Sequence, residues 1–158
     1  FFREDNFIAG LSMGGNGALL YALNHPEKFA ACAVLSCAPG DFDKIDMDSK
    51  EPGMQRTITS ALNAGGLEAY KASYENLWRL CGEKAKSGEL PRLYFTVGTN
   101  DFLFDRYMEF KAYAKKIGLE AQFREIEGYT HEWRFWDLTI QHALDFFGLK
   151  GKDEGNPF

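Results

Sequence analysis

Residues 6–24 read NFIAGLSMGGNGALLYALN, and this stretch decides the fold. A short apolar segment, residues 6–10, ends in glycine and predicts a strand. Residues 13–24 predict a helix, because apolar residues recur through them and His25-Pro26 closes the segment. A strand, a glycine-rich turn and a helix therefore follow one another directly in the chain.

Further strands and helices alternate along the rest of the chain. Residues 29–36 (FAACAVLS) and 92–97 (RLYFTV) predict strands of the kind buried on both faces of a parallel sheet. A further strand is predicted over residues 121–126, and helices are predicted over residues 105–117 and 132–147. This order predicts an α/β fold, with a mostly parallel sheet and helices on both of its faces.

Residues 39–90 separate two predicted strands by a stretch too long for a plain connection. An amphipathic helical stripe runs through it at three- to four-residue spacing, formed by Leu67, Tyr70, Tyr74, Leu77, Trp78 and Cys81. We expect a helical insert within one domain over this stretch. The aspartates between residues 41 and 48 lack the spacing of a calcium loop and predict a solvated loop. Residues 151–158 are expected to form a frayed tail.

Composition excludes several classes of function. The 158 residues carry a net charge of −5, which argues against binding to nucleic acid or to an anionic membrane. No apolar stretch is long enough for a transmembrane helix. Three scattered cysteines suit neither a disulfide scaffold nor a zinc site, and their odd number favours a reducing, cytoplasmic compartment. We expect no metal and no organic cofactor.

Residues 10–14, GLSMG, form a G-x-S-x-G motif between the first strand and helix, as a nucleophile elbow requires. So tight a turn should strain the backbone of Ser12, and the two glycines of the motif should remove side chains that would collide. Gly15 and Gly17 should let the helix pack closely. The N-terminus of the helix faces the serine, where the N–H of Met13 can donate to an oxyanion.

A serine hydroxyl needs a base to become nucleophilic, and the base needs an orienting carboxylate. Only three histidines are present. His131 lies in a loop after the last predicted strand and is the favoured base. His25 stands at a helix end and His142 within a helix, where structural roles explain them better.

Asp101 is the favoured carboxylate, because it follows the strand over residues 92–97. Asp105 is its competitor, although a cap at the start of the next helix explains that residue. The chain order of serine, Asp101 and His131 is the order found in α/β-hydrolases.

Four segments carry a resemblance to a known family: IAGLSMGGNGAL (8–19), HPEKFAACAVLSCAP (25–39), VGTNDFLF (97–104) and GYTHEWRFWD (128–137). They resemble the putative-esterase family of α/β-hydrolases, which includes esterase D (S-formylglutathione hydrolase), tributyrin-type acetyl esterases and feruloyl or acetyl-xylan esterases. The resemblance implies an acyl-accepting nucleophile, an orienting acid, a general base and an oxyanion donor. In that order, these roles fall on Ser12, Asp101, His131 and the N–H of Met13. The resemblance also implies that the helical insert at residues 39–90 is a cap over the active site, with its stripe either facing the acyl pocket or packing on the body of the domain.

The resemblance implies a serine carboxylesterase that hydrolyses short-chain acyl esters, such as acetyl or feruloyl esters or S-formylglutathione, through an acyl-enzyme. Leu11 and Trp133 are candidate substrate-binding residues, and Trp133 is equally well interpreted as a core anchor of the last helix. Two alternatives stay open. One is an acyltransferase with the same triad, and the other is a catalytically silent binding fragment.

Complete members of this family have about four more strands before the nucleophile, and a loop after one of them supplies the second oxyanion donor. We therefore expect this chain to be the C-terminal part of a larger esterase. The strand at residues 7–9 would then expose a free sheet edge. We expect that edge to be covered by a second copy of the chain, in a homo-oligomer, or by the N-terminal segment.

Overall fold

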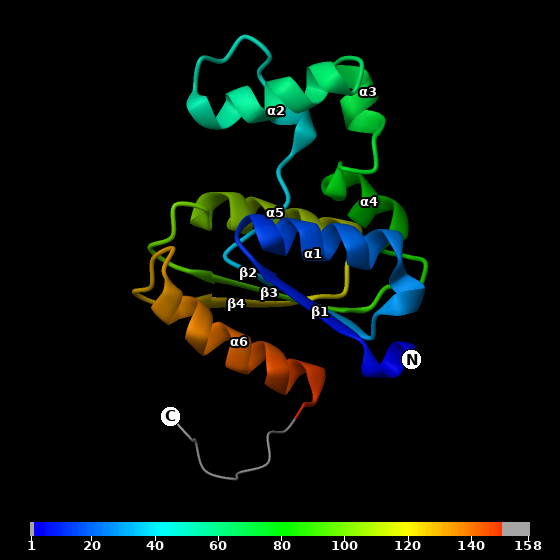
Figure 1. Cartoon of the computed structure of the whole chain (residues 1–158), viewed down its shortest axis with the longest axis vertical. Helices are drawn as coiled ribbons and strands as arrows, with labels where there is room; N and C mark the ends of the chain where they lie inside the picture. Colours follow the sequence, from blue (N-terminus) through cyan, green and yellow to red (C-terminus); the bar gives the residue numbers. More distant parts are fainter. Residues whose placement is uncertain (1, 150–158) are drawn as a thin grey trace.

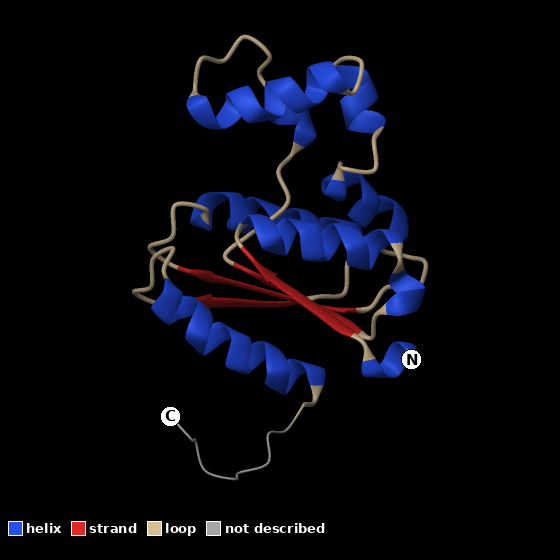
Figure 2. Cartoon of the chain, viewed as in Figure 1, coloured by secondary structure: helices blue, strands red, loops and turns tan. Residues whose placement is uncertain are grey.

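A four-stranded parallel sheet crosses the middle of the molecule (Figure 2). The computed structural model describes residues 2–149. The strands lie in the order β1-β2-β3-β4, which is also their order along the chain. Their bounds are β1 (Phe7–Leu11), β2 (Ala31–Leu35), β3 (Arg92–Gly98) and β4 (Gln122–Ile126). β1 and β4 therefore form the two edges of the described sheet.

Helices cover both faces of the sheet, which confirms the predicted α/β architecture (Figure 1). α1 (Met13–Asn24), α4 (Leu77–Lys84) and α5 (Phe104–Ile117) lie on one face. Of the helices in residues 2–149, α6 (Trp133–Phe147) is the one that covers the other face. Three short 3₁₀ turns complete this part of the chain, at η1 (Arg3–Asp5), η2 (Pro26–Lys28) and η3 (Phe42–Lys44).

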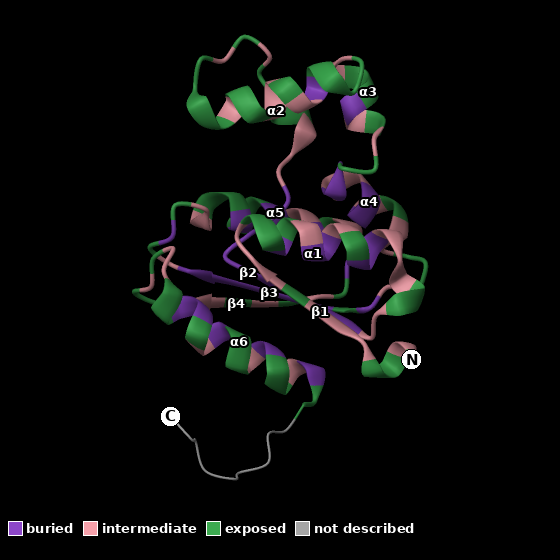
Figure 3. Cartoon of the chain, viewed as in Figure 1, coloured by how far each residue is buried: buried purple, intermediate pink, exposed green. Residues whose placement is uncertain are grey.

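The two core clusters divide β2 by alternate residues, as the period of a strand requires. Cys32 and Val34 face the cluster beneath α1, α4 and α5. Ala31, Ala33 and Leu35 face α6. Every residue of β2 is buried, and Figure 3 shows the same for most of β3. Burial on both faces explains why these strands read as continuous apolar runs.

The long insert holds α2 (Pro52–Asn63), α3 (Leu67–Ala72) and α4. α2 and α3 stand away from the sheet, above the layer of α1 and α5 (Figure 1). The amphipathic stripe is not one helix, because the chain breaks between Ala72 and Leu77, where Asn76 accepts from the N–H of Arg79 and caps α4. Tyr74, in the break, is 61% exposed.

The predicted tail over residues 151–158 lies outside the described residues. Within residues 2–149, none of the helices combines the length and the apolar character needed to cross a membrane.

Candidate active site

Ser12 stands at a sharp bend between β1 and α1, with φ 50° and ψ −124°. A residue with a Cβ adopts such a positive φ at a cost of about 1–3 kcal/mol. The N–H of Ser12 donates to the carbonyl of Leu35 at 2.8 Å, which ties the bend to β2. A Cβ at Gly10 would lie 2.1 Å from the carbonyl oxygen of Gly14, so this turn requires a glycine at position 10.

The other glycines of the bend differ in what they do. A Cβ at Gly14 or Gly17 would meet nothing within 4 Å, so the expectations of an avoided collision at Gly14 and of close packing at Gly17 are wrong. At Gly15 a Cβ would lie 3.0 Å from both the Cβ of Cys37 and the carbonyl oxygen of Gly10. Close packing of α1 on the sheet therefore depends on Gly15.

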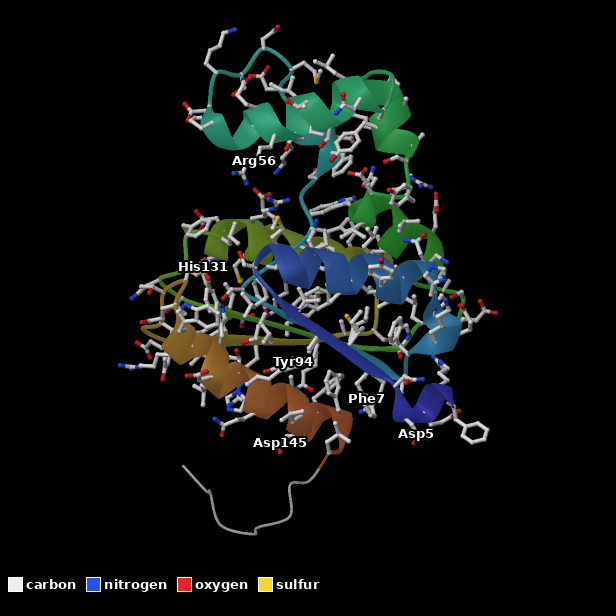
Figure 4. All side chains as sticks on the ribbon, viewed as in Figure 1. Asp5, Phe7, Arg56, Tyr94, His131 and Asp145 are labelled. Carbon is white, nitrogen blue, oxygen red and sulfur yellow. The ribbon has the colours of Figure 1, made fainter. Side chains whose placement is uncertain are left out.

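His131 joins two side chains that the sequence places far apart. Its Nε2 lies 2.9 Å from Ser12 Oγ, and its Nδ1 lies 2.8 Å from Asp101 Oδ2. With the ring proton on Nδ1, the imidazole donates to the carboxylate and accepts from the serine hydroxyl. The three residues follow β1, β3 and β4, whose carboxyl ends lie at one edge of the sheet, and Figure 4 labels His131 there.

The carboxylate of Asp101 is fixed on both of its oxygens. Its side chain is fully buried, and Oδ1 accepts from the N–H of Leu103 at 2.9 Å. Oδ2 is thereby left for His131. A carboxylate held in this way can orient an imidazole without itself turning.

The loop that carries Asp101 and the loop that carries His131 touch through their backbones. The carbonyl oxygen of Tyr129 accepts from the N–H of Asn100 at 2.9 Å. A Cβ at Gly98 would lie only 2.2 Å from the same oxygen. The end of β3 therefore sets the position of the loop that carries the histidine.

Met13 is the first residue of α1, directly after the serine. The first N–H groups of a helix have no acceptor within the helix, and the helix dipole favours negative charge at this end. The arrangement suits stabilisation of the negative charge that develops on a carbonyl oxygen when a hydroxyl at this bend attacks the carbonyl carbon. The role of the Met13 N–H as a donor stays a prediction.

A cavity of about 620 Å³ opens beside this helix end, between α1, η3, the insert and α5. It is lined by apolar, aromatic and charged side chains, among them Met13, Phe42, Tyr70, Tyr74 and Arg106. Lys44 and Glu109, which also line it, form an ion pair at 3.0 Å. Met13 lines the cavity and directly follows Ser12, so the cavity opens next to the bend that carries the serine.

The two candidate substrate-binding residues lie in different environments. Leu11 packs against the cluster between the sheet and α6. Trp133 is 71% exposed, so the interpretation of Trp133 as a core anchor is wrong, and Trp136 anchors α6 in its place. Binding of substrate by either candidate stays a prediction.

Sequence reasoning missed Phe102, whose ring centroid lies 4.7 Å from that of His131 although the side chain is 76% exposed. Its position directly after Asp101 was the signal that could have found it.

The competing residues lie elsewhere. Asp105 is exposed in the first turn of α5, where acidic residues are favourable. His25 follows α1 and lies 3.6 Å from Glu27. His142 lies in α6, where burial lowers its pKa below the ordinary value. None of the three has a hydrogen bond to Ser12 within residues 2–149.

The described residues contain no group of three or more His, Cys, Asp or Glu side chains that could hold a metal ion. The cysteines are free and buried. Burial raises the pKa of Cys32 and of Cys81 to about 12, and that of Cys37 to about 11. All three thiols therefore stay protonated near neutral pH and are poor nucleophiles.

A family model described as "Putative esterase" matches residues 2–147. The chain belongs to this esterase family. An acetyl esterase of Caldicellulosiruptor saccharolyticus is 28% identical over 155 residues, covering 91% of this chain and 54% of that protein. A diacylglycerol acyltransferase/mycolyltransferase Ag85B of Mycobacterium avium is 26% identical and covers 97% of this chain and 52% of that protein.

Solved structures of esterases share the fold. The S-formylglutathione hydrolase FrmB of Staphylococcus aureus is 28% identical, with a TM-score of 0.72 over 92% of this chain and 55% of that chain. A ferulic acid esterase is 27% identical, with a TM-score of 0.66 over 92% of this chain and 51% of that chain. These likenesses confirm the predicted α/β-hydrolase fold. The chain spans about half the length of the curated relatives it matches.

Proposed function

We propose that this chain carries the catalytic triad of a serine hydrolase that cleaves carboxylic esters. The observation that supports the proposal is the unbroken series of contacts from Ser12 Oγ through His131 to the buried carboxylate of Asp101. Such a series activates a serine hydroxyl in enzymes of unrelated folds. Membership of an esterase family agrees with it.

In the proposed reaction, Ser12 Oγ attacks the carbonyl carbon of the ester while Nε2 of His131 takes the hydroxyl proton. Asp101 stabilises the imidazolium that forms. The C–O bond to the alcohol then breaks as Nε2 returns the proton to the leaving oxygen. Water, deprotonated by the same nitrogen, then attacks the acyl-serine. The bond from the acyl carbon to Ser12 Oγ breaks as Nε2 returns this proton to Oγ, and the acid is released. The N–H of Met13 is placed to donate to the oxyanion of both tetrahedral intermediates.

Short acyl esters or thioesters are the proposed substrates. The cavity beside Met13 has room for a polar alcohol or thiol, since Arg106 and the Lys44–Glu109 pair line it together with aromatic rings. An acetyl esterase and an S-formylglutathione hydrolase among the relatives agree with a small acyl group. Assays with a series of p-nitrophenyl esters test this, and higher activity on octanoate than on acetate would contradict it.

Acyl transfer to an alcohol is the second candidate, and the mycolyltransferase among the relatives is the observation that favours it. Hydrolysis and transfer share the acyl-serine and differ only in the acceptor. Product analysis with a competing alcohol separates them. A product that is mainly the new ester would favour transfer.

The first experiment is labelling with a fluorophosphonate probe, followed by mass spectrometry of the modified peptide. We expect the label on Ser12, its loss in Ser12→Ala, and its retention in the matched control Ser87→Ala, which changes an exposed serine. A label on any other residue would contradict the assignment. A wild-type chain that folds but takes no label would favour the catalytically silent alternative.

We also propose that a further strand, from a second copy of the chain, pairs with β1. β1 is an edge of the described sheet, and Ala9 at its centre is exposed. Free N–H and C=O groups along an edge are a template for strand pairing. Sedimentation analysis tests this, and a monomer at all concentrations would contradict it.

A further inference from the structure

Trp136 lies against the imidazole of the proposed base. Its indole ring meets the ring of His131 at an interplanar angle of 89°, with the centroids 5.0 Å apart. The side chain is 9% exposed, and its Nε1 donates to the Oγ of Ser36 at 3.0 Å. This hydrogen bond, which joins residues 100 positions apart, fixes the orientation of the indole.

The backbone of Ser36 adopts an unfavourable conformation, and this conformation places its hydroxyl beside Trp136. Ser36 follows β2 directly, is fully buried, and has φ 47°. Glycine would adopt this conformation without strain, whereas a residue with a Cβ does not. The N–H of Ser36 donates to the carbonyl of Thr96 at 2.8 Å, so the end of β3 also fixes its position. The hydrogen bond that the Ser36 hydroxyl accepts from Trp136 explains why this position holds a serine rather than a glycine.

The end of β2 therefore contacts Ser12 directly and reaches His131 through Trp136. The carbonyl of Leu35 accepts from the N–H of Ser12, and the next residue, Ser36, holds the tryptophan that packs on His131. Phe102 contacts the same imidazole at 4.7 Å, with its ring tilted by 48°. Hydrogen bonds at Nδ1 and Nε2 fix the ends of the imidazole, and the aromatic contacts restrict the tilt of its plane.

We infer that Ser36 and Trp136 are positioning residues, which hold His131 in the orientation that aims Nε2 at Ser12 Oγ. This inference rests on the proposed function and adds two residues that act through His131. Loss of the Ser36 hydroxyl would free the indole, and the imidazole would spend less time in line with the serine. A misplaced catalytic group slows the reaction without weakening the binding of substrate.

Ser36→Ala and Ser36→Gly together separate positioning from stability. Both remove the hydroxyl, but glycine also relieves the strained φ, so the two variants should differ in thermal stability. The rate and the affinity of labelling of Ser12 by a fluorophosphonate are measured for each folded variant. We expect both to lose about tenfold in the labelling rate constant, with the probe affinity unchanged. A rate that follows the melting temperature of the two variants would overturn the inference.

Trp136→Phe keeps an aromatic ring but removes the N–H, so it should lose the same tenfold. The double variant with Ser36→Ala should lose no more than either alone, because both changes break one hydrogen bond. The matched control is Trp78→Phe, which changes a tryptophan packed in the other core cluster and should label at the wild-type rate. Wild-type rates in Ser36→Ala and Trp136→Phe would overturn this inference alone. Failure of the wild-type Ser12 to label would overturn the proposed function itself.

Discussion

Gly98→Ala should uncouple the histidine from the serine although it changes neither residue. Gly98 ends β3, and the added Cβ would lie 2.2 Å from the carbonyl oxygen of Tyr129 and 2.6 Å from its carbonyl carbon. Ordinary contact begins at 3.4 Å, so the backbone of Tyr129 must move by about 1 Å. Tyr129 lies two residues before His131, and the shift must pass into the loop that carries the imidazole.

The size of the effect follows from the distances in the triad. Nε2 of His131 lies 2.9 Å from Ser12 Oγ, and a further displacement of about 1 Å takes the pair outside hydrogen-bond range. A misplacement of this size costs a catalytic group roughly 100-fold in rate, equivalent to about 2.7 kcal/mol. Overpacking should also lower the free energy of unfolding, by about 1–3 kcal/mol.

The assay measures the rate at which a fluorophosphonate labels Ser12. Hydrolysis of p-nitrophenyl acetate is measured in parallel, and both are measured below the melting temperature of the variant. Gly53→Ala is the matched control, because a Cβ there meets nothing within 4 Å. It should react like the wild type. If Gly98→Ala were equally reactive while folded, the end of β3 would not position the histidine, and the reasoning would be refuted.

Three further predictions test the triad, the half-buried His142 and the sheet edge. Asp101→Asn keeps an acceptor for the N–H of Leu103 but loses the negative charge. It should lower the rate of ester hydrolysis by about 10⁴-fold and leave the circular dichroism spectrum unchanged. A loss of rate below tenfold would contradict the proposed role of Asp101. Burial, assisted by Arg124, lowers the pKa of His142 from 6.5, so the native state disfavours the charged form, and stability should be lost as the pH falls below about 6.5. Between pH 7.5 and 5, the urea midpoint of unfolding should fall less steeply in His142→Gln than in the wild type. An unchanged slope would argue against this effect of His142. Ala9→Lys places a charge on β1, at the edge of the described sheet. It should shift an oligomer towards monomer in gel filtration. An oligomer with an unchanged elution volume would place the interface elsewhere.

The fold was predictable where local chemistry sets the boundaries. α1 spans Met13–Asn24, as predicted, because a tight glycine turn precedes it and His25-Pro26 ends it. The parallel strands were predictable because strands buried on both faces read as apolar runs. Ser12, Asp101 and His131 could be chosen because each follows its own strand, although their catalytic roles stay predictions until they are tested.

Other features depend on contacts that no local pattern encodes. The stripe through the insert has helical spacing throughout, yet the chain breaks before α4, where Asn76 bonds to the backbone of both Lys71 and Arg79. The glycines of the bend look equivalent in the sequence, but only those at positions 10 and 15 meet neighbours. Ser36 reads as a mere interruption of an apolar run, because its partner Trp136 lies 100 residues away.

Backbone strain in this molecule lies at two serines whose hydroxyls bond to His131 or to the tryptophan beside it. Ser12 and Ser36 are the two residues other than glycine with positive φ in residues 2–149, and each directly follows one of two neighbouring strands. Each costs about 1–3 kcal/mol, which a marginally stable domain retains only where the surrounding structure fixes the conformation. β2 and β3 provide that constraint, since Leu35 and Thr96 accept the N–H bonds of the two serines. A buried pair of strands is therefore what allows a second strained serine, at the end of the strand next to the one that leads to Ser12, to hold Trp136 against the histidine.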